Sequence, residues 1–233
     1  MWDRKELKEK AKTAFKANYW KTVIVSVIFL IIGGGATLFT TYNYGGDATS
    51  SEELTAQINA MSQNEIIAVI LAVLGALAVA STIVFIIKIF LLNPLMVGCQ
   101  KFFRENAESP ADLDKLTRGF KPKYGNVVLT ILLQDIFLLL WSLLFVIPGI
   151  VKAYSYRMVP FIIADNPEMS AVDVITKSRD IMRGHKWNTF VLDLSFLGWL
   201  ILSGCTAGIL GIFYVNPYMF ETDAELYLAL KDN

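Results

Sequence analysis

Long apolar blocks alternate with short charged segments along this chain. The blocks cover residues 23–39, 66–92, 127–147 and 190–213, and each contains at most one charged residue. A helix that crosses the hydrocarbon core of a bilayer needs about 20 mostly apolar residues, and these blocks approach or exceed that length. Apolar residues make up 55% and charged residues 18% of the chain, whereas soluble domains average roughly 45–50% and 25%. We therefore expect an integral membrane protein built from helices.

The positions of Lys and Arg indicate which ends of the blocks face the cytoplasm. Seven of them precede the first block, whereas the polar segment 42–65 contains none. Two more basic segments follow, at 101–123 and at 177–186. Short loops rich in Lys and Arg stay cytoplasmic, so all three basic segments should lie inside. The N- and C-termini should then be cytoplasmic and the protein should lie in the plasma membrane.

Two further turns complete this topology. Because residues 126 and 165 should both be cytoplasmic, the segment between them must cross the membrane an even number of times, with a turn at Pro148-Gly149. By the same argument the last apolar block turns at 204–208. The sequence thus predicts six transmembrane helices, together with a short surface helix in the outer segment 45–64.

Three similar units follow one another along the chain. Each starts with a short amphipathic helix, and the predicted starts are Asp3, Ser109 and Ser170. Each returning span carries a proline, and these are Pro94, Pro160 and Pro217. The units cover about 1–103, 109–165 and 168–230 of a single membrane domain, 1–233. The predicted fold is therefore all-α and polytopic, with three hairpins, each preceded by an amphipathic helix in the membrane plane, in a pseudo-threefold repeat of parallel units.

Several segments resemble a known family. They are Asn-Tyr-Trp-Lys at 18–21, Tyr-Ser-Tyr-Arg-Met-Val-Pro at 154–160, Ala-Asp-Asn-Pro at 164–167, and the runs 171–178 and 184–187. They resemble a family of bacterial integral membrane proteins known as domain of unknown function 975, and the likeness extends over nearly the whole chain. That family is distantly similar to the membrane domain of glycerophosphodiester phosphodiesterases. The resemblance implies a multi-span bacterial plasma-membrane protein and brings no established activity or site residues.

Ionisable side chains inside the predicted spans form the first candidate site. Asp135 lies about nine residues into its span beside Gln134, and Asp193 lies about five residues into another. Charges at such positions are costly and often mark ion or proton pathways. A structural ion pair between helices is the alternative reading of Asp135, with Lys88 or Arg157 as the partner. The candidate intramembrane polar site consists of Gln134, Asp135, Asp193, Lys88 and Arg157.

A second candidate is the basic face of the third amphipathic helix and the turn that follows it. Lys177, Arg179, Arg183 and Lys186 lie there and would attract anionic lipid headgroups. A solvated basic face that only obeys the orientation rule is the simpler reading. The two readings are compatible with each other.

No catalytic or metal-binding pattern can be assembled from the sequence. The chain has one histidine, His185, and two cysteines, Cys99 and Cys205, that we place at opposite membrane faces. We expect no cofactor, no metal and no enzymatic activity, and the zero net charge gives no indication of a nucleic-acid partner. Two functions stay open. One is a membrane scaffold that contacts lipid or a partner membrane protein, and the other is a small transporter or channel that uses Gln134 and Asp135.

Overall fold

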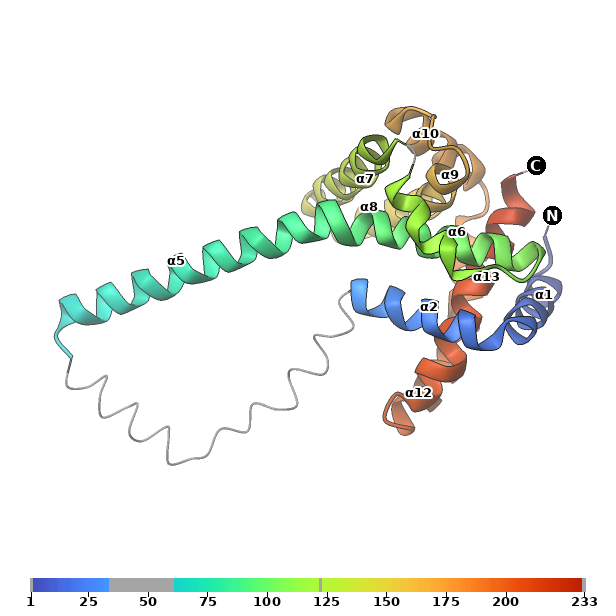
Figure 1. The fold of residues 1–233 in the computed structure, drawn as a ribbon, viewed down its shortest axis with the longest axis horizontal. Coiled ribbons are helices and arrows are strands. Elements are labelled where there is room, and N and C mark those ends of the chain that lie inside the picture. The colour runs from blue at the N-terminus through green and yellow to red at the C-terminus, as the bar shows by residue number, and fades with distance from the viewer. Residues whose placement is uncertain (1, 34–60, 122, 232–233) are drawn as a thin grey trace.

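Every regular element that the structure describes is a helix. The computed structural model describes residues 2–33, 61–121 and 123–231, and the all-α class is confirmed for these residues. Most of the predicted surface helix at 45–64 lies outside them. In chain order (Figure 1) the elements are α1 (Arg4–Ala17), α2 (Tyr19–Ile32), α5 (Gln63–Ile87), the π-helical turn η2 (Lys88–Leu92), α6 (Asn93–Glu108), the 3-10 helix η3 (Leu113–Phe120), α7 (Tyr124–Leu144), α8 (Val146–Tyr156), α9 (Val159–Asp165), α10 (Ala171–Ile181), α11 (Lys186–Leu194), α12 (Leu197–Cys205), the π-helical turn η4 (Gly211–Val215) and α13 (Asn216–Lys231).

Four helical stretches in the described part are long and apolar enough to cross a membrane. They are Gln63–Glu108, Tyr124–Leu144, Val146–Asp165 and Lys186–Cys205. A fifth is obtained if α1 and α2, which are bent by 105° relative to each other, count as one broken element. This number is compatible with a membrane protein. The six spans stay a prediction, because α2 has only 14 residues and α13 carries several carboxylates.

Two of the three predicted helix starts are confirmed. The side chain of Asp3 accepts a hydrogen bond from the backbone N–H of Lys5, and that of Ser170 accepts one from Asp173. The start predicted at Ser109 is wrong, because this residue ends α6 and the next helix begins only at Leu113. Asp112, which precedes that helix, makes no side-chain cap, and its carboxylate accepts a hydrogen bond from Lys21 Nζ at 2.5 Å. This hydrogen bond holds the pKa of the Asp112 carboxyl below its usual value.

The compact body is built around the three helices that start at the repeated prolines. Pro94, Pro160 and Pro217 each occupy the first turn of a helix, a position that tolerates proline. The central helix of the three, α6, packs against both α9 and α13. Most of the buried aromatic and aliphatic side chains, including Phe103 and Phe161, come from these helices and their neighbours. The prolines thus mark the beginning of the core helices.

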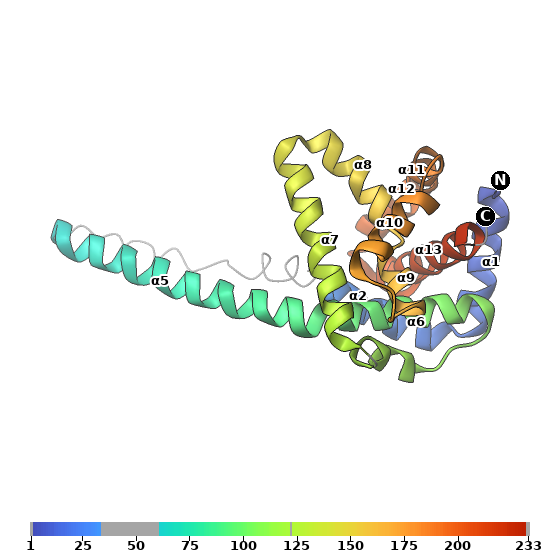
Figure 2. The ribbon, with the colours of Figure 1, turned by 90° about the horizontal axis from the view of Figure 1, so that it is seen from above.

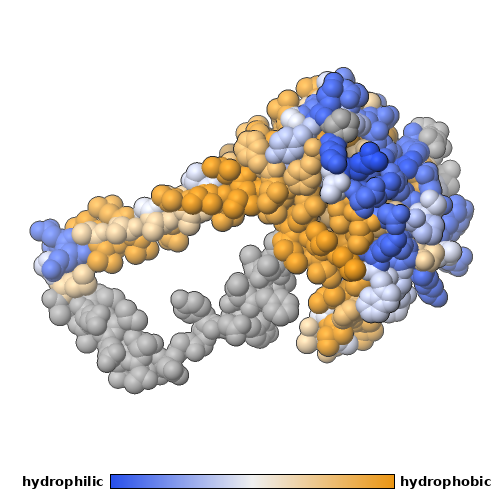
Figure 3. Space-filling view, in the orientation of Figure 1, coloured by the Kyte–Doolittle hydropathy of each residue, from blue (hydrophilic) through white to orange (hydrophobic). Residues whose placement is uncertain are grey.

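Helix α5 projects from this body as a long rod (Figures 1 and 2). None of its side chains is buried, although nearly all are apolar, as Leu71 and Leu77 illustrate. A helix that is apolar on every side is stable only inside a membrane or against other protein. Figure 3 shows the hydrophobic residues gathered over α5 and the adjoining side of the body, and the hydrophilic residues on the side where both chain ends lie in Figure 1. This separation is also compatible with insertion of one side into a membrane.

Candidate functional site

The first candidate pair joins the end of the long rod to α7. Lys88 in η2 lies 3.4 Å from Asp135 in α7, measured between Nζ and Oδ2. Of the two partners considered for Asp135, Lys88 is therefore the one in contact. The neighbouring Gln134 has a buried side-chain oxygen without a hydrogen-bond partner among the described residues.

Arg157 lies in a different cluster, which connects α8 with α11 and α13. Its guanidinium donates two hydrogen bonds to Asp193, at 2.7 and 2.9 Å, and a third to Asp223 at 2.6 Å. The hydroxyl of Tyr154 donates to the same Asp193 carboxylate at 2.8 Å. The sequence placed Arg157 and Asp193 in one candidate site without predicting this bidentate contact between them. Sequence reasoning also missed Asp223, which stands in the acidic stretch 221–225.

A third cluster surrounds Glu221, which is completely buried. One carboxylate oxygen accepts a hydrogen bond from Asn106 at 2.6 Å and one from Thr22 at 3.5 Å, while the other has no partner in the described part of the chain. Asn106 in turn accepts a hydrogen bond from Asn18 at 2.7 Å. The cluster therefore ties the bend between α1 and α2 to α6 and α13. Glu221, Asn106 and Thr22 did not stand out in the sequence, because their partners in this cluster are about 80 to 200 positions away in the chain.

Two asparagines each connect one predicted unit to the next. The side chain of Asn18 donates to the carbonyl of Ala111, just before η3, at 2.8 Å. The side chain of Asn126 donates to the carbonyls of Pro167 and Met169, just before α10, at 2.8 and 2.7 Å. The backbone carbonyl of each asparagine also accepts a hydrogen bond from the hydroxyl of a fully buried threonine four residues further on, Thr22 or Thr130. The same local bond is present in the third unit, between Thr189 and His185.

Two tyrosines replace hydrogen-bond donors that are missing because of prolines. The hydroxyl of Tyr19 donates to the carbonyl of Phe213 at 3.1 Å, and that of Tyr124 donates to the carbonyl of Phe90 at 2.5 Å. Both carbonyls lie four residues before a proline, which has no N–H to give them. Each also lies within the π-helical turn that precedes its proline. The kinked segments are thereby held by residues far away in the sequence.

The basic candidates lie on α10, on the turn that follows it and at the first residue of α11. Arg183 pairs with Asp180 at 2.8 Å. Lys177, Arg179 and Lys186 make no ion pair with any residue that the structure describes. In the same described ranges, no group of three or more His, Cys, Asp or Glu residues could hold a metal ion. Of the four residues predicted to contact lipid, Arg183 is therefore paired with a neighbouring aspartate, and the other three have no ion pair with a described residue.

Residues 143–233 match a family described as "Protein of unknown function (DUF975)". This segment is less than half of the chain and runs from the end of α7 through α13, so it includes Arg157, Asp193 and Asp223. The match supports the family of unknown function, and nothing supports the distant similarity to the membrane domain of glycerophosphodiester phosphodiesterases. No curated protein and no solved structure matches the chain.

Proposed function

We propose that this chain is an integral protein of the plasma membrane that acts as a non-enzymatic scaffold and contacts anionic lipid or a partner membrane protein. The observation that carries the proposal is the pairing of the candidate intramembrane charges. Lys88 meets Asp135, and Arg157 meets Asp193 together with Asp223. A transport pathway is usually marked by ionisable groups that face a water-filled cavity. Paired charges that join helices instead favour a structural role.

The proposal includes six spans arranged as three parallel hairpins around an axis. Contacts between the units support it. Asn18 of the first unit holds the segment before η3, and Asn126 of the second holds the segment before α10. The short helix of each unit packs on the return segment of another, α1 on α13, η3 on α6, and α10 on α8 and α9. Because the first unit thereby meets the third, the order of contacts closes on itself, as parallel repeats around a central axis require.

Thiol labelling tests the topology. Cys205 is exposed in α12, whereas Cys99 is fully buried and would stay unlabelled on either side of the membrane. The exposed residue Ser109 on the basic side therefore serves as the second reporter, as Ser109→Cys combined with Cys205→Ser. We expect a membrane-impermeant maleimide to label Cys205 of the unaltered protein in intact cells, and to label the Ser109→Cys variant only after lysis. The opposite pattern would contradict cytoplasmic termini.

A small transporter or channel is the second candidate function. The buried oxygen of Gln134, which has no partner in the described residues, favours it, because a transported ion or water could occupy that position. The pathway would pass between Gln134 and Asp135. The two candidates differ in what they require of Asp135. A scaffold needs its ion pair with Lys88, whereas a transporter needs its carboxylate even when the fold is unaffected.

Variants of Lys88 and Asp135 distinguish these functions. For a scaffold, Asp135→Asn and Lys88→Gln should each lower the free energy of unfolding in detergent by about 1–2 kcal/mol, since each leaves one charge alone in apolar surroundings. The exchanged pair Lys88→Asp with Asp135→Lys should recover part of that loss. Lys10→Gln is the control, because Lys10 pairs with Glu6 at an exposed site and such a pair contributes roughly 0.5 kcal/mol or less. If Asp135→Asn were fully stable but abolished a proton flux into reconstituted vesicles, the scaffold proposal would be wrong.

A further inference from the structure

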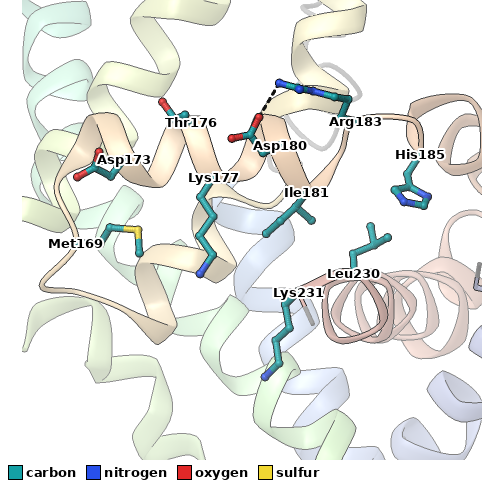
Figure 4. Close-up of a pocket in the computed structure, with 10 residues that line it drawn as sticks. All are labelled: Met169, Asp173, Thr176, Lys177, Asp180, Ile181, Arg183, His185, Leu230 and Lys231. Atoms are coloured by element: carbon teal, nitrogen blue, oxygen red, sulfur yellow. Dashed lines mark hydrogen bonds and ion pairs between the residues drawn. The ribbon is translucent and has the colours of Figure 1, made fainter. Parts of the chain in front are cut away.

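A hollow of about 650 Å³ lies between α10, the turn that follows it, and the end of α13 (Figure 4). Its walls include Lys177 and Ile181 of α10, Arg183 and His185 of the turn, and Leu230 and Lys231 of α13. The hollow is therefore formed by segments that are up to about 60 residues apart in the sequence. Only Lys177 and Arg183 of this set belong to the predicted lipid-contacting residues.

Among the described residues, the lining of the hollow carries three cations and two anions, a net single positive charge. Asp180 pairs with Arg183 at 2.8 Å, whereas Asp173 accepts a hydrogen bond from the neutral hydroxyl of Ser170 at 2.6 Å and keeps its negative charge. Lys177 and Lys231 make no ion pair with any residue in the described ranges. Figure 4 shows Lys177 extending from α10 toward the end of α13, where Lys231 lies. Two neighbouring ammonium groups of this kind attract an anion.

His185 adds a polar group on another wall. Its Nδ1 is buried and has no hydrogen-bond partner in the described part of the chain, although the residue lines the hollow. His185 immediately precedes α11, which begins without a side-chain cap. The first N–H groups of such a helix carry its partial positive charge. Figure 4 shows Ile181 and Leu230 between His185 and the two lysines, so the imidazole lines the hollow apart from them.

We propose that this hollow binds a phosphoryl group, held by Lys177 and Lys231. Lysine provides a compact charge with three donors, which suits the tetrahedral oxygens of a phosphate. Ile181 and Leu230 give the hollow an apolar part beside these donors. The phosphoryl group can belong to a lipid headgroup or to a free phosphate. The lipid source rests on the membrane location proposed above, whereas the free phosphate does not.

Titration of the purified full-length protein in detergent tests this site. The probes are inorganic phosphate, dioctanoyl phosphatidylglycerol and, as the neutral lipid, dioctanoyl phosphatidylcholine, each followed by thermal shift and calorimetry. We expect one or both of the first two to bind and to raise the melting temperature. Lys177→Gln with Lys231→Gln should weaken that binding at least tenfold, which corresponds to about 1.4 kcal/mol or more. His185→Gln, which changes a wall apart from the lysines, should weaken binding less than the lysine pair does.

Matched controls separate this site from general attraction between charges. Lys12→Gln with Lys16→Gln removes two exposed lysines from α1, outside the hollow, and should leave binding unchanged. Binding of phosphatidylglycerol alone identifies a headgroup site, and binding of phosphate alone identifies a site for a soluble anion. Equal loss in both double variants, or no binding of either anion to the stable unaltered protein, would overturn the proposal. Reversed labelling of Cys205 would refute the topology and leave the result with inorganic phosphate unaffected.

Discussion

Replacing Arg157 with methionine is expected to lower the free energy of unfolding by about 3–5 kcal/mol, measured by thermal or chemical unfolding in detergent. Arg157 is the only cation among the described residues that contacts Asp193 and Asp223, and its guanidinium makes three hydrogen bonds to them. Its removal leaves two carboxylates close together in partly buried surroundings. The contacts between α8, α11 and α13 should therefore weaken together.

The reason for this loss can be tested by removing the remaining charges as well. Arg157→Met combined with Asp193→Asn and Asp223→Asn should recover a large part of the stability, since neutral partners can stay close without repulsion. Arg183→Met is the control, because the pair of Arg183 with Asp180 is exposed and should contribute less than about 1 kcal/mol. A single Arg157→Met variant as stable as the unaltered protein would show that the cluster does not hold these helices.

Gly119→Ala is expected to separate η3 from α6 and to cost about 3 kcal/mol or more. A Cβ atom at position 119 would lie 1.8 Å from the carbonyl oxygen of Pro94, and one at Gly98 would lie 2.0 Å from the carbonyl oxygen of Leu116. Both obstacles are backbone atoms, so no side-chain rotation can make room. The melting temperature should fall, and the rate of tryptic cleavage after Lys115, which lies in η3, should rise.

A neighbouring glycine provides the matched control for this experiment. Gly125 lies in the first turn of α7, and a Cβ atom added there would meet nothing within 4 Å. Gly125→Ala should leave stability unchanged or raise it by roughly 0.5–1 kcal/mol, because alanine favours the helix. If Gly119→Ala and Gly125→Ala behaved alike, the close backbone contact between η3 and α6 would not exist in solution.

The sequence predicted what depends on local patterns. Apolar blocks predicted helices, and the starts at Asp3 and Ser170 are confirmed because each cap needs only a side chain and an N–H group two or three residues away. The start predicted at Ser109 is wrong because α6 continues to Glu108 and the next helix begins only at Leu113. Asp112, which the pattern paired with the cap three residues before it, instead accepts a hydrogen bond from Lys21, 91 residues away.

Residues that join distant segments were harder to recognise. Lys88 was named as a partner of Asp135 because two opposite charges in apolar spans stabilise each other, and the two are indeed 3.4 Å apart. The pairing of Arg157 with Asp193 depends on how α8 packs against α11. The spacing of apolar residues along the chain does not predict that packing. Glu221 lay in a polar stretch, where a carboxylate normally indicates exposure, and only its position between α6 and α2 makes it buried.

The tyrosine contacts have a consequence for the order in which the chain can be completed during synthesis. The carbonyl of Phe90 can gain its donor only after Tyr124, 34 residues later, has left the ribosome. The carbonyl of Phe213, by contrast, pairs with Tyr19, which was made 194 residues before it. The first of these contacts must therefore wait for further synthesis, whereas the second can form as soon as η4 emerges.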